Sequence, residues 1–425
     1  MGQLAQIGHP GSIGRGRGRP PPRIWRRATW RSQLHQNGYT RAVGWEAFMT
    51  LRTTAIAVAA LAAALWGAAP AGASTTWRTQ AVPEPANSTM GLNDVSCPST
   101  GVCIAVGQAN DNTTHTPFTV AEQRAAGRWT IVPTPSPDST VLMSVSCLSA
   151  TDCTAFGTRR VQGGDRTLAE HWDGSGWAIQ PSPNPAGATE GELDHGTCAS
   201  PTSCIAVGIW AKTGTKEQPL AEHWDGSNWT ITGLPLPAGA GGGSLSGVSC
   251  ASATDCNAVG EYFFPSNPGT LALGEHWNGT SWTLRPMASP AGAVFVFPQA
   301  VSCTGPKHCM AVGGVNTSGV APLVERWDGS AWTIQTDAAP AGTELSGVSC
   351  TSSSSCTAVG GNTSDTGVAE HWDGTGWTLQ TLPVAHKNAF AGLSGVSCLS
   401  ATNCTAAGSY SFHGGRGTHA LADHE

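Results

Sequence analysis

Four short segments decide the fold of this chain, and one copy reads SGVSC at residues 346–350, CTAVG at 356–360, VAEHWDG at 368–374 and GWTLQ at 376–380. Each segment is rich in Val, Thr, Trp and Ala, and turn-forming residues separate it from the next. Short runs of this composition between turn residues are typical of β-strands. The pattern therefore predicts four antiparallel strands joined by tight turns.

This four-strand unit repeats along the chain, and the repeats can be counted from the cysteines. All 14 cysteines fall into pairs separated by five residues, and successive pairs begin 50, 51, 52, 53, 47 and 48 residues apart. A period near 50 residues indicates propeller blades or a solenoid, and four antiparallel strands per period favour a blade. The seven pairs are Cys97 and Cys103, Cys147 and Cys153, Cys198 and Cys204, Cys250 and Cys256, Cys303 and Cys309, Cys350 and Cys356, and Cys398 and Cys404.

The two ends of the chain distinguish a closed ring from an open solenoid. The last repeat stops after its third segment, LADHE at 421–425, and lacks a fourth strand. An unpaired fourth segment, TWRTQ at 76–80, stands before the first repeat and matches 376–380. We therefore predict an all-β, seven-bladed β-propeller whose last blade is completed by an N-terminal strand, about residues 76–82. Closure also removes the free sheet edges that invite aggregation.

The segment 49–73 has the features of a secretory signal peptide. A short basic start is followed by an apolar run over 55–69 and by the small residues 71–73, which predicts cleavage before Ser74. The alternative, a membrane anchor, needs about 20 apolar residues, and this run is shorter and ends at Pro70. We therefore expect a secreted, extracellular protein without stable membrane insertion.

Residues 1–48 precede this signal and do not fit an exported protein. Their bias toward Arg, Gly and Pro suggests translated upstream sequence with Met49 as the true start, and the alternatives are a long basic leader or a disordered arm. Of 22 basic and 28 acidic residues in the whole chain, 13 and 27 lie in 74–425, a net charge of −14. A domain this acidic disfavours nucleic acid as a partner. We expect 74–425 to form one propeller domain and a monomer.

The cysteine pairs are predicted to be disulfides within hairpins. One cysteine ends the first strand of each repeat and the other begins the second, so the two positions face each other. Even cysteine spacing in an exported chain is typical of a disulfide framework. Zinc binding is disfavoured because the C-x2-C spacing is missing, and a redox role would need one special pair. We expect no metal and no cofactor.

A second motif, W-D-G-x-x-W, joins the third and fourth strands of four repeats. Asp-Gly is a strong signal for a tight turn, because Gly accepts positive φ and Asp can bond its own backbone. The turn residues are Asp173, Gly174, Asp225, Gly226, Asp328, Gly329, Asp373 and Gly374. The motif resembles the Asp-box of sialidase-type β-propellers, S-x-D-x-G-x-T-W. The Gly-to-Trp spacing agrees, as from Gly226 to Trp229, but the Asp stands directly before the Gly.

The whole repeat, GVSC…C-x-AVG…AEHWDG-x-x-W, resembles secreted repeat proteins of high-GC Gram-positive bacteria over residues 75–425. Those proteins are mostly of unknown function. The resemblance implies a propeller fold and export, and it implies little about activity.

Glu-His pairs recur in the third segment, as in Glu170-His171 and Glu275-His276, with Arg326 or Arg124 in place of His in two repeats. Such pairs suggest acid-base or metal chemistry. An active site breaks the symmetry of a ring, however, whereas a structural contact repeats with it. We therefore interpret these pairs as structural and predict no catalytic residue.

Few chemically reactive residues occur in one repeat only and so break the symmetry of the ring. A sialidase-like site would need clustered arginines with a tyrosine and an acid, and the candidates are Arg159, Arg160, Arg166, Glu261 and Tyr262. No sequence typical of a serine hydrolase, a zinc protease or a P-loop occurs.

The loops between second and third strands, and the exits from fourth strands, differ in every repeat. In an up-and-down blade these two sets share one face, which we call the crown, while the constant turns share the other, which we call the base. Variable loops on a rigid scaffold usually carry function. The sequence favours a non-enzymatic binding or adhesion propeller whose crown recognises a glycan, a peptide or a cell-wall component. The alternatives are a glycan hydrolase acting at the crown and a purely structural envelope protein.

Overall fold

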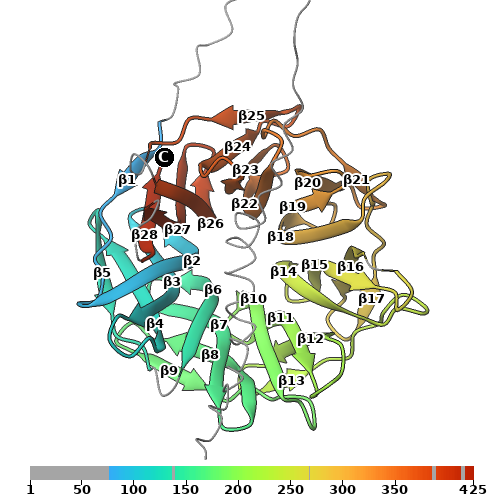
Figure 1. The fold of residues 1–425 in the computed structure, drawn as a ribbon, viewed down its shortest axis with the longest axis horizontal. Helices are drawn as coiled ribbons and strands as arrows, with labels where there is room; N and C mark the ends of the chain where they lie inside the picture. The colour runs from blue at the N-terminus through green and yellow to red at the C-terminus, as the bar shows by residue number, and fades with distance from the viewer. Residues whose placement is uncertain (1–75, 136–138, 268, 385–388, 413–416) are drawn as a thin grey trace, which may run out of the picture. The chain divides into compact units, whose positions relative to one another are not determined.

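The computed structural model describes residues 76–135, 139–267, 269–384, 389–412 and 417–425. These residues belong to the second of two compact units, which starts at Ala71. Their 28 strands form seven four-stranded antiparallel sheets arranged in a ring (Figure 1). This confirms the predicted seven-bladed propeller. The predicted extension over 1–48 and the signal peptide over 49–73 lie outside the described residues. Within the described ranges, no helix is long and apolar enough to cross a membrane.

The strands follow the same order in every blade, from the ring axis outward (Figure 1). We number the blades 1 to 7 in the chain order of their innermost strands. The innermost strands are β2 (Ser88–Ser99), β6 (Thr140–Ser149), β10 (Glu190–Ser200), β14 (Gly242–Ser252), β18 (Phe295–Gly305), β22 (Thr343–Ser352) and β26 (Ala389–Ser400). The second strands are β3 (Val102–Asp111), β7 (Asp152–Val161), β11 (Ser203–Ala211), β15 (Asp255–Phe263), β19 (His308–Asn316), β23 (Ser355–Asn362) and β27 (Asn403–Phe412). The third strands are β4 (Pro117–Ala125), β8 (Gly164–Trp172), β12 (Gln218–Trp224), β16 (Leu271–Trp277), β20 (Val320–Trp327), β24 (Gly367–Trp372) and β28 (His419–His424). The outermost strands are β5 (Arg128–Val132), β9 (Trp177–Gln180), β13 (Trp229–Ile231), β17 (Trp282–Leu284), β21 (Trp332–Ile334), β25 (Trp377–Gln380) and, in blade 7, β1 (Arg78–Gln80).

Each innermost hairpin is held by a disulfide and bent by a β-bulge. In blade 4, Cys250 faces Cys256 across β14 and β15, with their Cα atoms 3.9 Å apart. The bulge shifts the register between Leu245 and Gly247. At this point the two backbones approach so closely that a Cβ on Gly260 would lie 2.1 Å from the Ser244 carbonyl oxygen. This contact explains the glycine that ends each C-x-A-V-G segment.

The hydrophobic core lies between blades. One cluster packs Ile205 and Val207 of blade 3 against Leu245, Val248 and Trp277 of blade 4. Because each blade buries one face against its predecessor and the other against its successor, no blade has a complete core of its own.

A ring of hydrogen bonds near the axis joins successive innermost strands. A serine hydroxyl of one blade accepts the backbone N–H of the first disulfide cysteine of the next, at 2.9 to 3.0 Å, at six of the seven junctions. The donors and acceptors are Cys97 and Ser397, Cys147 and Ser96, Cys198 and Ser146, Cys303 and Ser249, Cys350 and Ser302, and Cys398 and Ser349. Thr197 takes the place of the serine at the remaining junction.

Strand β1 completes blade 7, as predicted, and it also bridges the blades on either side. Arg78, Thr79 and Gln80 pair antiparallel with residues of β28. The Trp77 indole, 3% exposed, donates from Nε1 to Gln380 of blade 6 at 2.9 Å. The Gln80 side chain accepts from Trp129 of blade 1 at 2.8 Å. The strand itself is shorter than the expected 76–82.

Candidate functional site

The cysteine pairs and the Asp-Gly turns lie together at the base. Adjacent strands are antiparallel, so the first and third turns of each blade reach the same end of the sheet. All seven predicted disulfides form, each within one hairpin, which confirms the pairing. The bonds join Cys97 to Cys103, Cys147 to Cys153, Cys198 to Cys204, Cys250 to Cys256, Cys303 to Cys309, Cys350 to Cys356 and Cys398 to Cys404. Among the described residues, no group of three or more His, Cys, Asp or Glu side chains is arranged to hold a metal ion.

The structure corrects where these cysteines lie on their strands. The first cysteine does not end its strand, which runs two residues further, and the second cysteine is the second residue of its strand rather than the first. In blade 5, Cys303 faces Cys309, whereas beyond them Gly305 faces His308. This shift of register lets both strands continue past the disulfide toward the turn.

The second cysteine of each pair also lies beside the third strand of its blade, and it is the more deeply buried of the two. Cys309 pairs with Trp327 and Cys356 with Trp372, and all seven second cysteines are at most 4% exposed. In blade 7 the carbonyl of Cys404 accepts the backbone N–H of Glu425 at 3.0 Å, so Glu425 occupies the tryptophan position. The structure thus gives the cysteines a structural role within each blade.

The Asp-Gly turns are fixed by the aspartate side chain. Oδ1 of Asp173 accepts the backbone N–H groups of Ser175 and Gly176 at 2.8 and 3.0 Å, and Gly174 has φ 91°. The Ser175 hydroxyl also donates to this oxygen, and these bonds lower the pKa of Asp173 to about 2. The same geometry recurs at Asp328 and in other blades, so the structure gives these residues a role in the turn.

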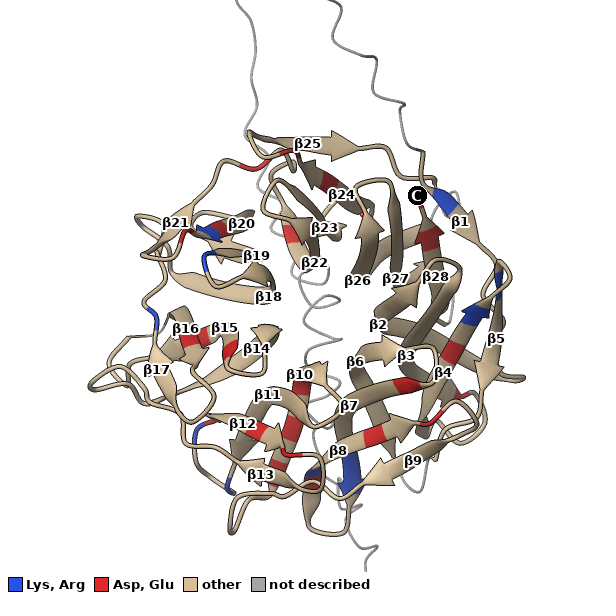
Figure 2. Cartoon of the chain, turned by 180° about the vertical axis from the view of Figure 1, so that it is seen from behind, with Lys and Arg blue, Asp and Glu red and all other residues tan. Residues whose placement is uncertain are grey.

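The acids of the four Glu-His pairs, with the equivalent acids of the other three blades, form a ring of seven buried carboxyl groups, one on the third strand of each blade. Figure 2 shows acidic segments on strands of successive blades. All seven side chains are at most 2% exposed: Glu122, Glu170, Glu222, Glu275, Glu325, Glu370 and Asp423. Burial raises the pKa of each, to about 8 for the first four, about 7 for the next two and about 6 for Asp423.

The linker that enters from the preceding blade supplies partners to Glu222, Glu325 and Glu370, whereas Asp423 bonds Thr79 on β1 of its own blade. Glu222 accepts from the Ser182 hydroxyl at 2.7 Å, and Glu325 accepts from the Ala288 N–H at 2.9 Å. The structure corrects one assignment: Arg124 does not replace His. It pairs with Cys103 as Trp172 pairs with Cys153, so Arg124 occupies the Trp position.

A cleft lies at the base between blades 2 and 3. Polar residues of blade 2 line one side of it, and Trp224 of blade 3 lines the other. Its volume is 380 Å³. Blade 2 contributes Asp152, Thr154, His171 and Gln180, and blade 3 contributes Trp224 with its disulfide. The Trp224 indole donates to the Pro201 carbonyl at 3.1 Å, which fixes the ring.

Trp224 is more exposed than its counterparts. The equivalent rings Trp172, Trp277, Trp327 and Trp372 are 4 to 7% exposed, whereas Trp224 is only partly buried. The neighbouring blade can cover such a ring; His223, for example, lies 5.6 Å from Trp277. In blade 2 the corresponding His171 bonds Asp152 of its own blade instead, with 3.0 Å between Nε2 and Oδ1.

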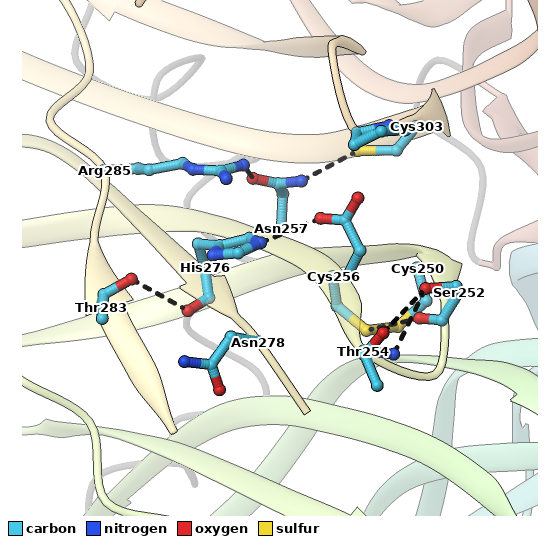
Figure 3. A network of polar contacts seen from close by, with 12 residues as sticks. Cys250, Ser252, Thr254, Cys256, Asn257, His276, Asn278, Thr283, Arg285 and Cys303 are labelled. Carbon is cyan, nitrogen blue, oxygen red and sulfur yellow. Dashed lines mark hydrogen bonds and ion pairs between the residues drawn. A yellow bond between two sulfur atoms is a disulfide. The ribbon is translucent and has the colours of Figure 1, made fainter. Parts of the chain in front are cut away.

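The equivalent junction between blades 4 and 5 shows how such a cleft is filled. Its histidine, His276, also bonds an aspartate of its own blade, Asp255 at 2.9 Å. There, however, Arg285 lies over the Trp327 ring at 4.3 Å. Its guanidinium group also donates to the buried Asn257 (Figure 3). Blade 2 has Gln180 at the position of Arg285, and the shorter side chain leaves the space open.

The crown carries aromatic side chains at one recurring position, the end of the second strand that is nearer the crown. Trp210, Tyr262 and Tyr410 occupy it in blades 3, 4 and 7. The Tyr410 ring stacks on His419 with centroids 5.2 Å apart, and the Lys212 ammonium group lies 5.9 Å from the Trp210 ring. Sequence reasoning misses these residues as a set because they stand where the second strand runs into a variable loop, although alignment on the cysteines places them in register.

The arginines and the Glu-Tyr pair of the sialidase-like hypothesis are not brought together. Arg159, Arg160 and Arg166 lie on β7 and β8 of blade 2, whereas Glu261 and Tyr262 lie on β15 of blade 4, with blade 3 between them. Moreover, Nε and one terminal nitrogen of Arg160 bond the carboxylate of its hairpin partner Asp165, each at 2.8 Å.

Comparison with known proteins shows the fold. No protein-family model matches the chain, and no curated protein matches its sequence. YCF48 bound to a D1 peptide is 12% identical with a TM-score of 0.52, covering 84% of this chain and 96% of that one. YCF48 from Cyanidioschyzon merolae is 13% identical with a TM-score of 0.48, covering 82% and 98%. A fucose-specific lectin from Aleuria aurantia is 13% identical with a TM-score of 0.43, covering 71% and 98%. The first similarity supports a shared propeller fold and does not extend to a ligand.

Proposed function

We propose that residues 74–425 form an exported, non-enzymatic binding protein whose crown recognises an extracellular ligand, a glycan, peptide or cell-wall component. The observation that carries the proposal is the recurring aromatic position at the crown. Trp210, Tyr262 and Tyr410 present large rings at the ends of rigid strands, next to loops that differ from blade to blade. Aromatic side chains are enriched in binding surfaces because they offer large contact area at low entropic cost.

Export is supported by the seven disulfides, since such bonds persist in oxidising compartments. If the segment 49–73 is a signal peptide, mass spectrometry of the secreted protein will find Ser74 at the N-terminus. Recovery of residues 1–48 from exported protein would contradict both the cleavage site and the start at Met49.

The binding proposal is tested by a glycan array followed by pull-down from culture supernatant. The triple variant Trp210→Ala, Tyr262→Ala, Tyr410→Ala should lose the captured ligand. Because the three rings also pack against hydrophobic clusters, its melting temperature should fall, and binding is measured at a temperature at which circular dichroism shows the variant folded. Its matched control is Thr378→Ala at an exposed position on β25, which should bind as wild type. Equal capture by both variants would exclude the aromatic crown position as the recognition surface. Turnover of fluorogenic glycosides would favour the hydrolase instead.

A further inference from the structure

The cleft between blades 2 and 3 has the composition of a binding site for a small polar ligand. Its 380 Å³ volume falls within the usual range for small-molecule sites. One wall is the partly exposed face of Trp224, held in place by the bond to Pro201. The opposite wall is polar, with Asp152, His171 and Gln180. The cleft lies at the base, away from the crown loops.

The polar wall offers both donors and acceptors in fixed positions. Nε2 of His171 is held by Asp152, so Nδ1 faces no described partner. The Gln180 side-chain oxygen accepts from the Trp229 indole at 3.1 Å, and its amide nitrogen has no hydrogen-bond partner among the described residues. Thr154 adds a hydroxyl to the lining. Mixed donors and acceptors around an aromatic face suit a neutral molecule that carries several hydroxyl groups.

The charges at the cleft disfavour anionic and cationic ligands. The described residues that line it include no lysine or arginine, and Asp173 joins Asp152 as a second carboxylate. An anionic ligand would therefore meet repulsion. A cationic ligand could contact Trp224 and two carboxylates. Both carboxylates already have hydrogen-bond partners, however: Asp152 bonds His171, and Asp173 bonds residues of its own turn.

We infer that this cleft is a binding site for a neutral sugar unit, with the pyranose or furanose ring stacked on Trp224 and its hydroxyl groups bonded by His171, Gln180 and Thr154. Two differences coincide at this junction of the described ring. His171 is turned away from the tryptophan by Asp152, and Gln180 is too short to cover it. At the junction of blades 4 and 5, the first condition holds but Arg285 fills the space.

The decisive variant is Gln180→Arg, which introduces the side chain that fills the equivalent space in blade 4, although blade 2 has Thr154 where Arg285 bonds Asn257. Saturation-transfer NMR would be recorded on the whole secreted chain with the methyl glycosides of glucose, galactose, mannose, fucose, xylose and N-acetylglucosamine. We expect signal from at least one of them, its loss in Gln180→Arg and a roughly tenfold weaker affinity in Trp224→Ala. The matched control is Gln335→Arg, the same substitution in blade 5, where Met310 already packs between the blades. It should bind as wild type.

Three results would overturn the inference. The first is a wild-type protein that gives no signal with any of the six glycosides. The second is Gln180→Arg binding as tightly as the wild type while both proteins melt at the same temperature. The third is a signal from tetramethylammonium that depends on Gln180 without one from any sugar, because the cleft would then be a cation site.

Discussion

At the scale of the residue, Glu275 illustrates the energetic effect of the buried acids. Its carboxyl group is 1% exposed and has no hydrogen-bond partner among the described residues, and burial raises its pKa from 4.5 to about 8. Between these values the folded chain keeps a proton that the unfolded chain releases, so stability falls as the pH rises, by up to about 1.4 kcal/mol per pH unit. Glu275→Gln should match wild type at pH 4 and exceed its stability at pH 8. Urea unfolding at both pH values measures the difference, with the partly exposed Glu344→Gln as control. If the free energy of unfolding changed equally with pH in the wild type, Glu275→Gln and Glu344→Gln, the buried Glu275 carboxyl group would not be the cause of the pH dependence.

At the scale of the element, the closing segment contributes chiefly through Trp77, the residue that precedes β1. Trp77 is 3% exposed, packs in a cluster shared by blades 6 and 7 and bonds Gln380 of blade 6. Trp77→Ala should lower the free energy of unfolding by about 3 kcal/mol, the usual cost of deleting a buried tryptophan. The neighbouring Arg78→Ala, an exposed position on the same strand, should change it by less than about 0.5 kcal/mol. Denaturant melts provide both values, and equal values would mean that β1 is not a closing strand.

The strands and hairpin disulfides can be predicted where the repeats share the same recognisable residues at the same spacing. The closing strand follows from the match of 76–80 with 376–380, and the hairpin disulfides follow from the constant spacing of the pairs. Blade 1 has no tryptophan on its third strand. Without that residue as a reference, an alignment of the repeats places Arg124 at the histidine position instead of the tryptophan position that follows it. The exact strand ends are not predictable, because the register shift beyond Cys303 and Cys309 leaves no mark in the sequence.

The cleft could not be predicted at all. His171 and His276 look alike in sequence, yet only the second junction has an arginine over its tryptophan. Arg285 follows β17, whereas His276 lies on β16, so the contact depends on how two separate segments of blade 4 pack against the next blade.

At the scale of the whole molecule, the ring is closed twice, which changes the effect expected from removing β1. The outer closure is β1 on β28, and the inner closure joins blades 7 and 1 through the bond between Ser397 and Cys97 and a shared hydrophobic cluster. Deleting residues 74–83 should therefore lower the melting temperature, because Trp77 and three residue pairs are lost. It should leave the radius of gyration nearly unchanged by small-angle X-ray scattering. A large expansion would show that the ring depends on β1 alone.

The register of β1 on β28 also determines the order in which the strands separate when the two ends of the chain are pulled apart. Arg78 lies opposite His424, so the chain enters one strand and leaves the other at the same end. A pull on both termini therefore loads the residue pairs one after another, as in a zipper, and the seam opens at low force. Blade 7 is released next. Because each disulfide joins cysteines only six positions apart, it holds back just the short turn between them and leaves the rest of each freed blade able to extend.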